Sequence, residues 1–313
     1  MSRISRYKES IEKFFKGKSF ITEINETSRN QILEISPQTD YFVSIVLLTV
    51  MNNVSKKHNL SLHGYFMASG IESLYILNKI LENKHYYENK LGQAELFRLI
   101  LIIHNNVYKS LSQNIDTIST HLPKEKVLKI NSLATKYLTS KLESLNGSCN
   151  EPNLPWKKND LLKYKFEDKT LIQKINNLKV YSKDELVKYI ENRLGAICKI
   201  TLVIGWLLGN GDEKNIPVLE KLAVYMAKMI KVAYDFNSLE DDIKIGNKYT
   251  LNSVITLGFQ ESFELFQYNR EKFVEGCMML DIHTNTIKEI IDVLESRIDI
   301  YIDNTATQTE STN

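Results

Sequence analysis

The sequence predicts an all-α protein, organised as one helical domain over residues 1–303. Only 12 glycines and 5 prolines interrupt the 313 residues, and long segments repeat apolar residues at i, i+3, i+4 and i+7, the spacing of one helix face. Alternation with a period of two, which marks half-buried strands, is nearly absent. The 43% hydrophobic and 25% charged residues are typical of a globular protein.

Nine helices are predicted in chain order. Five lie in the first half, each with an apolar face at helical spacing, at 4–16, 40–56, 61–84, 91–113 and 125–145. Four lie in the second half, at 183–209, 216–240, 259–278 and 284–301. Ser182 and Glu185 form a capping pair before the sixth helix, and Pro217 occupies the first turn of the seventh, after a Gly-rich break. The sixth and seventh helices should therefore be antiparallel neighbours.

Two segments lack this periodicity. Residues 147–182 hold two of the five prolines and many charges, and we interpret them as a loop-rich excursion between core helices. Residues 304–313 form a polar tail that is expected to be disordered.

Charge, cysteine content and hydropathy exclude several classes of protein. The 40 basic and 38 acidic residues leave a formal net charge of +2, without the basic surplus of nucleic-acid-binding proteins. Three cysteines without a CxxC pair predict neither a disulfide framework nor a zinc site, and indicate a reducing, cytoplasmic compartment. The longest uncharged apolar run, 42–51, is about half of what a membrane-spanning helix needs, so no span is expected.

The segment 228–258 stands out because an apolar helix ends there in four carboxylates, Asp235, Glu240, Asp241 and Asp242. On a helix, Asp235 and Asp242 share a face, so two carboxylates could converge on one divalent cation. A solvated helix end is the alternative. Acidic residues at a C-terminal helix end oppose the helix dipole, which favours a functional reason for them.

Residues 181–208 and 228–258 resemble the second half of trans-isoprenyl diphosphate synthases, specifically the eukaryotic geranylgeranyl diphosphate synthase branch. The resemblance is carried by the order and spacing of five short motifs: Arg193-Leu194-Gly195, Ala233-Tyr234-Asp235-Phe236-Asn237, Asp241-Asp242-Ile243, Gly246-Asn247-Lys248 and Val254-Ile255-Thr256-Leu257. Residues 280–300 and 7–18 are similar to the closing and opening helices of the family, and 68–74 to the helix before its first aspartate-rich motif.

The resemblance implies an isoprenoid-synthase type helical bundle that binds prenyl diphosphates. In the family, two aspartate-rich helices hold magnesium on an allylic diphosphate, which isopentenyl diphosphate then attacks after ionisation. Transferred residue by residue, it implies Asp235 and Arg193 as catalytic residues and Lys18, Arg193 and Lys248 as contacts to substrate diphosphates.

The same resemblance implies Asp235, Asp242 and Glu82 as magnesium ligands, with Glu82 the weakest candidate. Tyr65, Phe66 and Tyr75 are candidate walls of the prenyl tunnel, although aromatic stripes at helical spacing are more often core packing. A homodimer, or a heterodimer with a catalytic prenyl synthase subunit, is the expected assembly. The helix carrying Trp206 and the 91–113 helix are the candidate faces.

The sequence departs from the family at its charged motifs. The first aspartate-rich motif is replaced by Asn78-Lys79-Ile80-Leu81-Glu82, with one carboxylate and one added cation, and the second keeps only Asp235 in register. We therefore expect a divergent family member with impaired chain elongation, either a pseudoenzyme or a regulatory subunit.

Two further functions stay open. One is an active, magnesium-dependent prenyltransferase that condenses isopentenyl diphosphate with an allylic diphosphate. The other is a class I terpene cyclase on the same fold, because Asp235, Ser238 and Asp242 are similar in spacing to the Asn-Asp-x-x-Ser-x-x-x-Glu metal motif of such enzymes.

Overall fold

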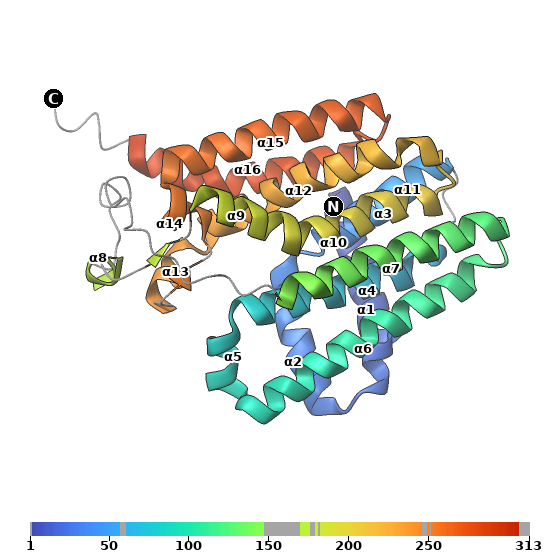
Figure 1. Cartoon of the computed structure of the whole chain (residues 1–313), viewed down its shortest axis with the longest axis horizontal. Helices are drawn as coiled ribbons and strands as arrows, with labels where there is room; N and C mark the ends of the chain where they lie inside the picture. Colours follow the sequence, from blue (N-terminus) through green and yellow to red (C-terminus); the bar gives the residue numbers. More distant parts are fainter. Residues whose placement is uncertain are drawn as a thin grey trace. The chain divides into compact units, whose positions relative to one another are not determined.

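The computed structural model describes residues 2–56, 61–146, 170–175, 179–180, 182–245, 249–250 and 252–306. Regular structure in these residues is helical apart from two short strands, β1 (Lys179–Val180) and β2 (Tyr249–Thr250), which pair in parallel. The predicted all-α class is confirmed. The chain, whose colours in Figure 1 follow the sequence, divides into two compact units.

Unit 1 comprises Met1–Leu142, Ala196–Ala223 and Gly276–Ile290. Its complete elements are α1 (Arg3–Gly17), η1 (Phe20–Glu23), α2 (Glu26–Ile35), η2 (Ser36–Thr39), α3 (Phe42–Ser55), α4 (Ser61–Glu82), α5 (Lys84–Leu91), α6 (Gln93–Ile118), α10 (Ala196–Lys199), η5 (Ile200–Ile204), α11 (Gly205–Leu208) and η6 (Glu213–Asn215). It also contains most of α7 (Lys124–Asn146) and parts of α12 (Ile216–Asn237), α15 (Phe259–Met279) and α16 (Asn285–Ala306).

Helix α3 forms the centre of unit 1. Its residues from Phe42 to Met51 are all buried, as expected for a helix that is apolar on every side. Helix α11 approaches it closely through Gly205 and Gly209: a Cβ on these residues would lie 2.9 Å from the Leu47 carbonyl oxygen and 2.6 Å from that of Met51. The apolar run 42–51 is thus core, and none of the described helices is long and apolar enough to cross a membrane.

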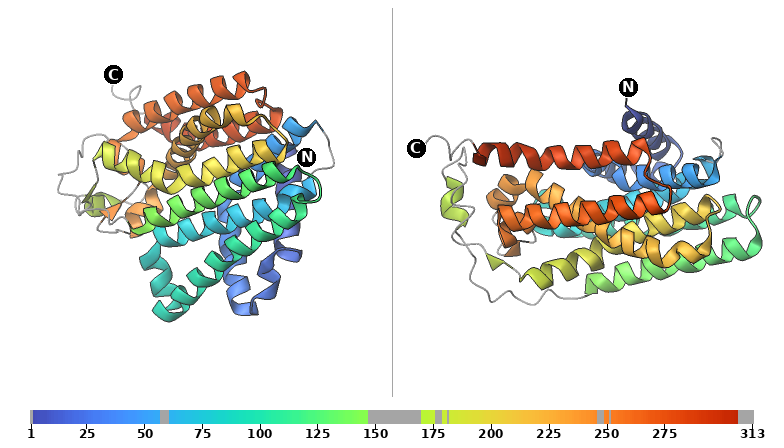
Figure 2. Two further views of the ribbon diagram at one scale, coloured as in Figure 1. Left: turned by 45° about the vertical axis from the view of Figure 1, so that its right-hand side comes forward. Right: turned by 90° about the horizontal axis from the view of Figure 1, so that it is seen from above.

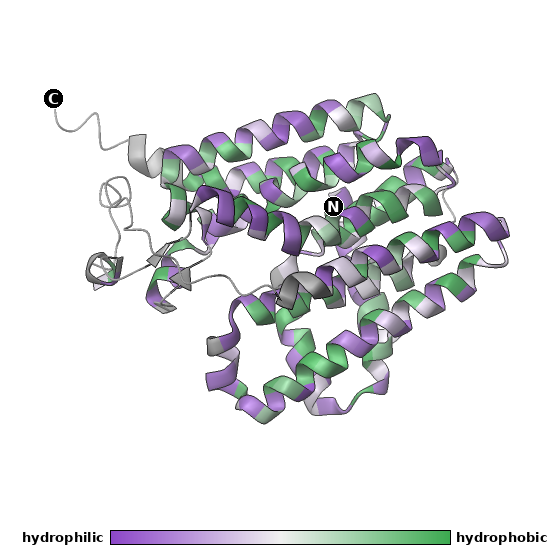
Figure 3. Cartoon of the chain, in the orientation of Figure 1, coloured by the Kyte–Doolittle hydropathy of each residue, from purple (hydrophilic) through white to green (hydrophobic). Residues whose placement is uncertain are grey.

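Helix α6 packs extensively against α4, and the views in Figures 1 and 2 show α4, α6 and α7 side by side. The buried face of α6 includes Leu99, Ile103 and Val107. Apolar residues also lie outside this face, and the hydrophobic colouring continues along much of α6 in Figure 3. This exposed set, Phe97, Leu101 and Tyr108, is hereafter the α6 stripe.

Unit 2 comprises Glu143–Gly195, Val224–Glu275 and Ile291–Asn313. It contains α8 (Thr170–Ile175), β1, α9 (Lys183–Ile190), η4 (Glu191–Gly195), α13 (Leu239–Ile245), β2, α14 (Ser253–Leu257) and the remaining parts of the long helices. The predicted capping pair is present: the Ser182 hydroxyl accepts from the Glu185 amide, and the Glu185 carboxylate accepts from the Ser182 amide at 2.8 Å. Phe236 and Phe266 are among its fully buried side chains.

All nine predicted helices are found, with several differences in detail. The expected helix at 216–240 breaks at Ser238 into α12 and α13, and α16 runs to Ala306, three residues into the predicted tail. The run 183–208 is helical throughout, but η4 and η5 in it are π-helical. Four short helices were not predicted, α2, α5, α8 and α14. Most of the expected excursion, and the tail after Ala306, lie outside the described residues.

Candidate functional site

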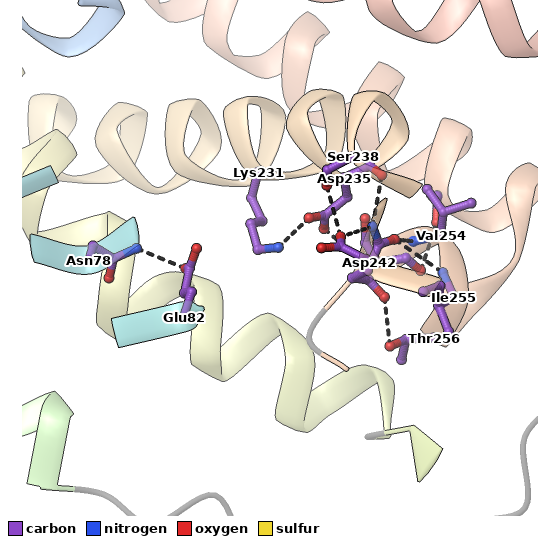
Figure 4. Close-up of polar contacts among 12 residues, drawn as sticks. Asn78, Glu82, Lys231, Asp235, Ser238, Asp242, Val254, Ile255 and Thr256 are labelled. Atoms are coloured by element: carbon purple, nitrogen blue, oxygen red, sulfur yellow. Dashed lines mark hydrogen bonds and ion pairs between the residues drawn. The ribbon is translucent and has the colours of Figure 1, made fainter. Parts of the chain in front are cut away.

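Asp235 lies near the C-terminal end of α12 and is only 3% exposed. Lys231, one helical turn earlier and 9% exposed, forms an ion pair with its Oδ1 atom. The backbone N–H of Ser253, at the start of α14, donates to its Oδ2 atom at 2.8 Å. Both carboxylate oxygens of Asp235 therefore have a donor from unit 2 itself (Figure 4).

Burial raises the pKa of Asp235, because removal from water disfavours the charged form. Lys231 and the Ser253 amide act in the opposite direction, since both stabilise the carboxylate, while the nearby Asp242 adds to the increase. The ion pair with Lys231 is thus what allows a carboxylate to be buried at this position.

Asp242, in α13, is held next to Asp235 by Asn252. The Asn252 side-chain amide donates to the Asp235 carbonyl oxygen at 2.8 Å and to Asp242 Oδ2 at 2.7 Å. Ser238 Oγ donates to the same Asp242 oxygen at 2.8 Å. The Asn252 Oδ1 atom accepts from the amides of Val254 and Ile255, which caps α14. The predicted proximity of Asp235 and Asp242 is thus explained by a polar network, which we call the Asp235 cluster.

In unit 1, the segment that replaces the first aspartate-rich motif lies at the end of α4. Asn78 is 1% exposed, and its side-chain amide donates to Glu82 Oε1 at 2.8 Å. The fully buried ammonium of Lys141, in α7, donates to Asn78 Oδ1. An amide and an ammonium group therefore stand beside Glu82, in place of further carboxylates.

The three candidate diphosphate contacts, Arg193, Lys18 and Lys248, have different surroundings or lie outside the described residues. Arg193 lies in the π-helix η4, with its guanidinium 4.9 Å from the Tyr189 ring centroid. Its Nε atom is buried and has no hydrogen-bond partner among the residues that the structure describes. π-Helical segments are frequent at functional sites. Lys18 is exposed at the C-cap of α1. Lys248 lies outside the described residues.

Two of the candidate tunnel residues face the N-terminal helix of unit 1. Phe14 of α1 stacks on Tyr65 with ring centroids 5.1 Å apart and meets Phe66 edge-on at the same distance. Tyr75 is 2% exposed. A narrow apolar cavity lies beside another face of α4, between it and α6, α7 and η5, with Met67, Gly70, Leu74, Val107 and Leu138 among its walls. The tunnel role of the three aromatic residues stays a prediction.

The residues at the Asp235 cluster do not fit a magnesium ion as they stand. Magnesium requires an octahedral shell of oxygens, in which one or two carboxylates join substrate phosphates and water. Here an ammonium and a backbone N–H occupy the two oxygens of Asp235. In the described part of the chain, no group of three or more His, Cys, Asp or Glu side chains has the arrangement of a metal site. The metal role of Asp235, Asp242 and Glu82 is not favoured by these contacts.

The side chains of Lys231, Asn252 and Lys141 belong to these networks but were not among the predicted site residues. The sequence could have indicated the pairing of Lys231 with Asp235, since the two residues lie four apart on the same predicted helix. Asn252 carries the local signature of an N-cap before a helix. Lys141 has no local signature, because it meets Asn78 across 63 residues of sequence.

No protein-family model matches the sequence, and no curated protein matches it significantly. Solved structures do match over nearly the whole chain. A geranyltransferase from Legionella pneumophila aligns with a TM-score of 0.63 at 11% identity, over 95% of this chain and 96% of its own. A geranyltransferase from Helicobacter pylori 26695 aligns with a TM-score of 0.58 at 14% identity, over 95% and 99%.

A geranylgeranyl pyrophosphate synthetase from the archaeon Geoglobus acetivorans aligns with a TM-score of 0.53 at 12% identity, over 99% of this chain and 92% of its own. At such identities the similarity establishes the fold, and the predicted relation to the eukaryotic geranylgeranyl diphosphate synthase branch stays a prediction. The chain has the all-α isoprenoid synthase fold, and its structural neighbours are trans-isoprenyl diphosphate synthases.

Proposed function

We propose that this chain is a divergent protein of isoprenoid metabolism that binds prenyl diphosphates but is impaired in chain elongation, as a pseudoenzyme or a regulatory subunit. The observation that carries the proposal is the environment of Asn78. Where the resemblance expects carboxylates for magnesium, a buried amide is bonded to the buried ammonium of Lys141. The positive charge of Lys141 repels metal ions, and Glu82 is the one carboxylate in the sequence of residues 78–82.

Diphosphate binding is proposed to use Arg193, Lys18 and Lys248. Support is strongest for Arg193, because its guanidinium keeps a buried N–H without a partner among the described residues, and guanidinium groups match phosphate oxygens in geometry. Arg193 and Asp235 are the proposed catalytic residues if elongation survives. That alternative would also need magnesium at Asp235, Asp242 and Glu82.

A homodimer, or a heterodimer with a catalytic prenyl synthase subunit, is proposed to use the α6 stripe. Phe97, Leu101 and Tyr108 are 63%, 52% and 39% exposed and spaced as one helix face. Of the two expected faces this is the exposed one, since Trp206 is 8% exposed and donates its indole N–H to the Asp212 carbonyl oxygen at 2.9 Å. Sedimentation of a Leu101→Glu variant tests the proposal, and an unchanged dimer would remove the stripe from the interface. The cytoplasm is proposed as compartment from the cysteine content alone.

The proposed function is tested by incubating the purified protein with isopentenyl diphosphate, geranyl or farnesyl diphosphate, and magnesium. Mass spectrometry then examines both the diphosphate and the hydrocarbon fractions, with controls lacking protein or metal. We expect no new product in either fraction, together with measurable binding of farnesyl diphosphate.

Each other outcome selects another function. A longer prenyl diphosphate would establish an active prenyltransferase. A terpene hydrocarbon or alcohol would establish the cyclase. Loss of either product in an Asp235→Asn variant with unchanged helix content would assign that carboxylate to the reaction.

A further inference from the structure

In a metal site, a carboxylate binds a metal cation. At Asp235 the carboxylate instead binds the ammonium group of Lys231, a cation that belongs to the protein. Lys231 lies one turn before Asp235 on α12, so the helix itself fixes the ammonium beside the carboxylate. The second carboxylate oxygen accepts from Ser253 N–H at 2.8 Å. The side chains of Lys231 and Asp235 are 11% and 4% exposed, respectively, so little water remains to solvate either charge.

We propose that the Lys231 ammonium replaces a divalent cation at Asp235, and that unit 2 binds the diphosphate of an isoprenoid without a metal. The part that concerns diphosphate rests on the proposed function, whereas the part that concerns the cation does not. A diphosphate would then be held by basic groups directly, and Arg193 of the same unit has a buried N–H that finds no partner in the described part of the chain.

Charge balance supports this replacement. Lys231 offsets Asp235 one to one, and the neighbouring carboxylate of Asp242 is solvated by the Ser238 hydroxyl and the Asn252 amide. A magnesium ion entering here would have to displace the ammonium from Asp235, and separating a buried ion pair is costly. Both oxygens of Asp235 and one oxygen of Asp242 therefore have donors from the protein itself.

The test uses manganese as the probe, on the full chain without substrate, with free Mn²⁺ followed by electron paramagnetic resonance. We expect no Asp235-dependent site in the wild-type protein. The Lys231→Met variant should gain such a site, with affinity at least about tenfold higher than that of the wild type, and Mn²⁺ should raise its melting temperature. Adding Asp235→Asn to Lys231→Met should abolish both effects.

Lys228→Met is the matched control. Lys228 lies on the same helix and pairs with Glu191 at 2.7 Å, but that glutamate side chain is 41% exposed. This variant should gain no manganese response. A folded Lys231→Met variant without any gain would overturn the proposal, as would wild-type Mn²⁺ binding that Asp235→Asn removes. This last comparison decides the matter even if Lys231→Met does not fold.

Calorimetry with farnesyl diphosphate separates the proposal from the function on which part of it rests. Equal binding in EDTA and in magnesium supports both. Binding that requires magnesium overturns the metal-free site and leaves the proposed function standing. Absence of binding in both buffers removes the proposed function and the diphosphate part, while the manganese titration still decides the role of Lys231.

Discussion

Asp235 in unit 2 and Glu72 in unit 1 are two buried carboxylic acids in chemically different surroundings. Asp235 has an ammonium and a backbone N–H at its two oxygens. Glu72, fully buried on α4, has two hydroxyls: Thr39 Oγ1 at Oε1, and Ser44 Oγ at Oε2, 2.7 Å away. A full positive charge is thus present beside one acid, whereas the contacts of the other are neutral hydroxyls.

The hydroxyls around Glu72 have more acceptors than hydrogens. Thr39 Oγ1 also lies 2.8 Å from the Ser36 carbonyl oxygen, and Ser44 Oγ lies 3.0 Å from that of Ala68. The two hydroxyl hydrogens have four acceptors nearby, namely these two carbonyl oxygens and the two Glu72 oxygens. A proton on Glu72 would therefore add a third hydrogen to the group. Burial, as the largest cause, raises the pKa of Glu72 to about 7. The comparison teaches that burial raises the pKa of both acids, and that a full positive charge opposes this increase at Asp235 whereas two neutral hydroxyls oppose it at Glu72.

The largest effect is expected from Lys231→Met. It leaves Asp235 buried without its cation, so the free energy of unfolding should fall by about 3–5 kcal/mol, measured by urea denaturation at pH 7. Lys228→Met should cost less than about 1 kcal/mol, because the carboxylate it loses is exposed to water. If Lys231→Met lowers the free energy of unfolding no more than Lys228→Met does, the ion pair with Lys231 is not what allows Asp235 to be buried.

The pH dependence of stability tests Glu72. Between its usual pKa of 4.5 and the raised value of about 7, the folded chain holds a proton that the unfolded chain has lost. Stability from this group therefore falls as the pH rises through that window, by about 3 kcal/mol in total, and is level above it.

Glu72→Gln isolates this contribution, because it keeps the shape and cannot titrate. The difference in unfolding free energy between wild type and variant, followed from pH 4.5 to 8, should therefore change by the same amount. Asp40 and Lys8, which also act on the pKa of Glu72, are unchanged in both proteins. Parallel curves for the two proteins would mean that Glu72 titrates normally.

Asn252→Ala should have an intermediate effect. It removes the N-cap of α14 and the amide shared by the Asp235 carbonyl oxygen and Asp242, so a loss of about 1–2 kcal/mol is expected from denaturation. Asn252→Asp keeps an oxygen that can cap α14 but loses the amide. It also places a further carboxylate beside Asp242. If Asn252→Asp is as stable as the wild type at pH 7, the amide contributes nothing to the cluster.

The smallest effect is expected from Ser44→Ala, which sharpens the contrast at Glu72. The Ser44 hydroxyl lowers the pKa of Glu72, so its removal should raise that pKa further and cost about 1 kcal/mol at neutral pH. The measurement is the midpoint of the stability transition with pH. Ser73→Ala is the control, because the Ser73 hydroxyl donates to the Ser69 carbonyl oxygen, 3.0 Å away on the same helix. A midpoint shifted to lower pH would contradict the assigned role of Ser44.

The sequence alone determined the helices and the fold class. The apolar period, the scarcity of glycine and proline, and the capping pair at Ser182 and Glu185 are local features, and the hydrogen bonds they serve join residues about four apart. The short helices α2 and α14 escaped prediction because fewer than three turns give too little periodicity. The π-helical turns at Arg193 and Ile200 carry no pattern in the sequence that distinguishes them from α-helix.

The contacts of the buried charged residues, by contrast, depend on the tertiary structure. The sequence placed Asp235 and Asp242 on one side of a helix, with Lys231 one turn earlier, but the neutral N–H donors to their carboxylates come from Ser253 and Asn252, beyond the next helix. Lys141 meets Asn78, and Glu72 meets Thr39, across 63 and 33 residues. A helix forms from neighbouring residues, whereas the state of a buried charge is set by whichever groups packing brings within about 3 Å of it, and no local pattern specifies those.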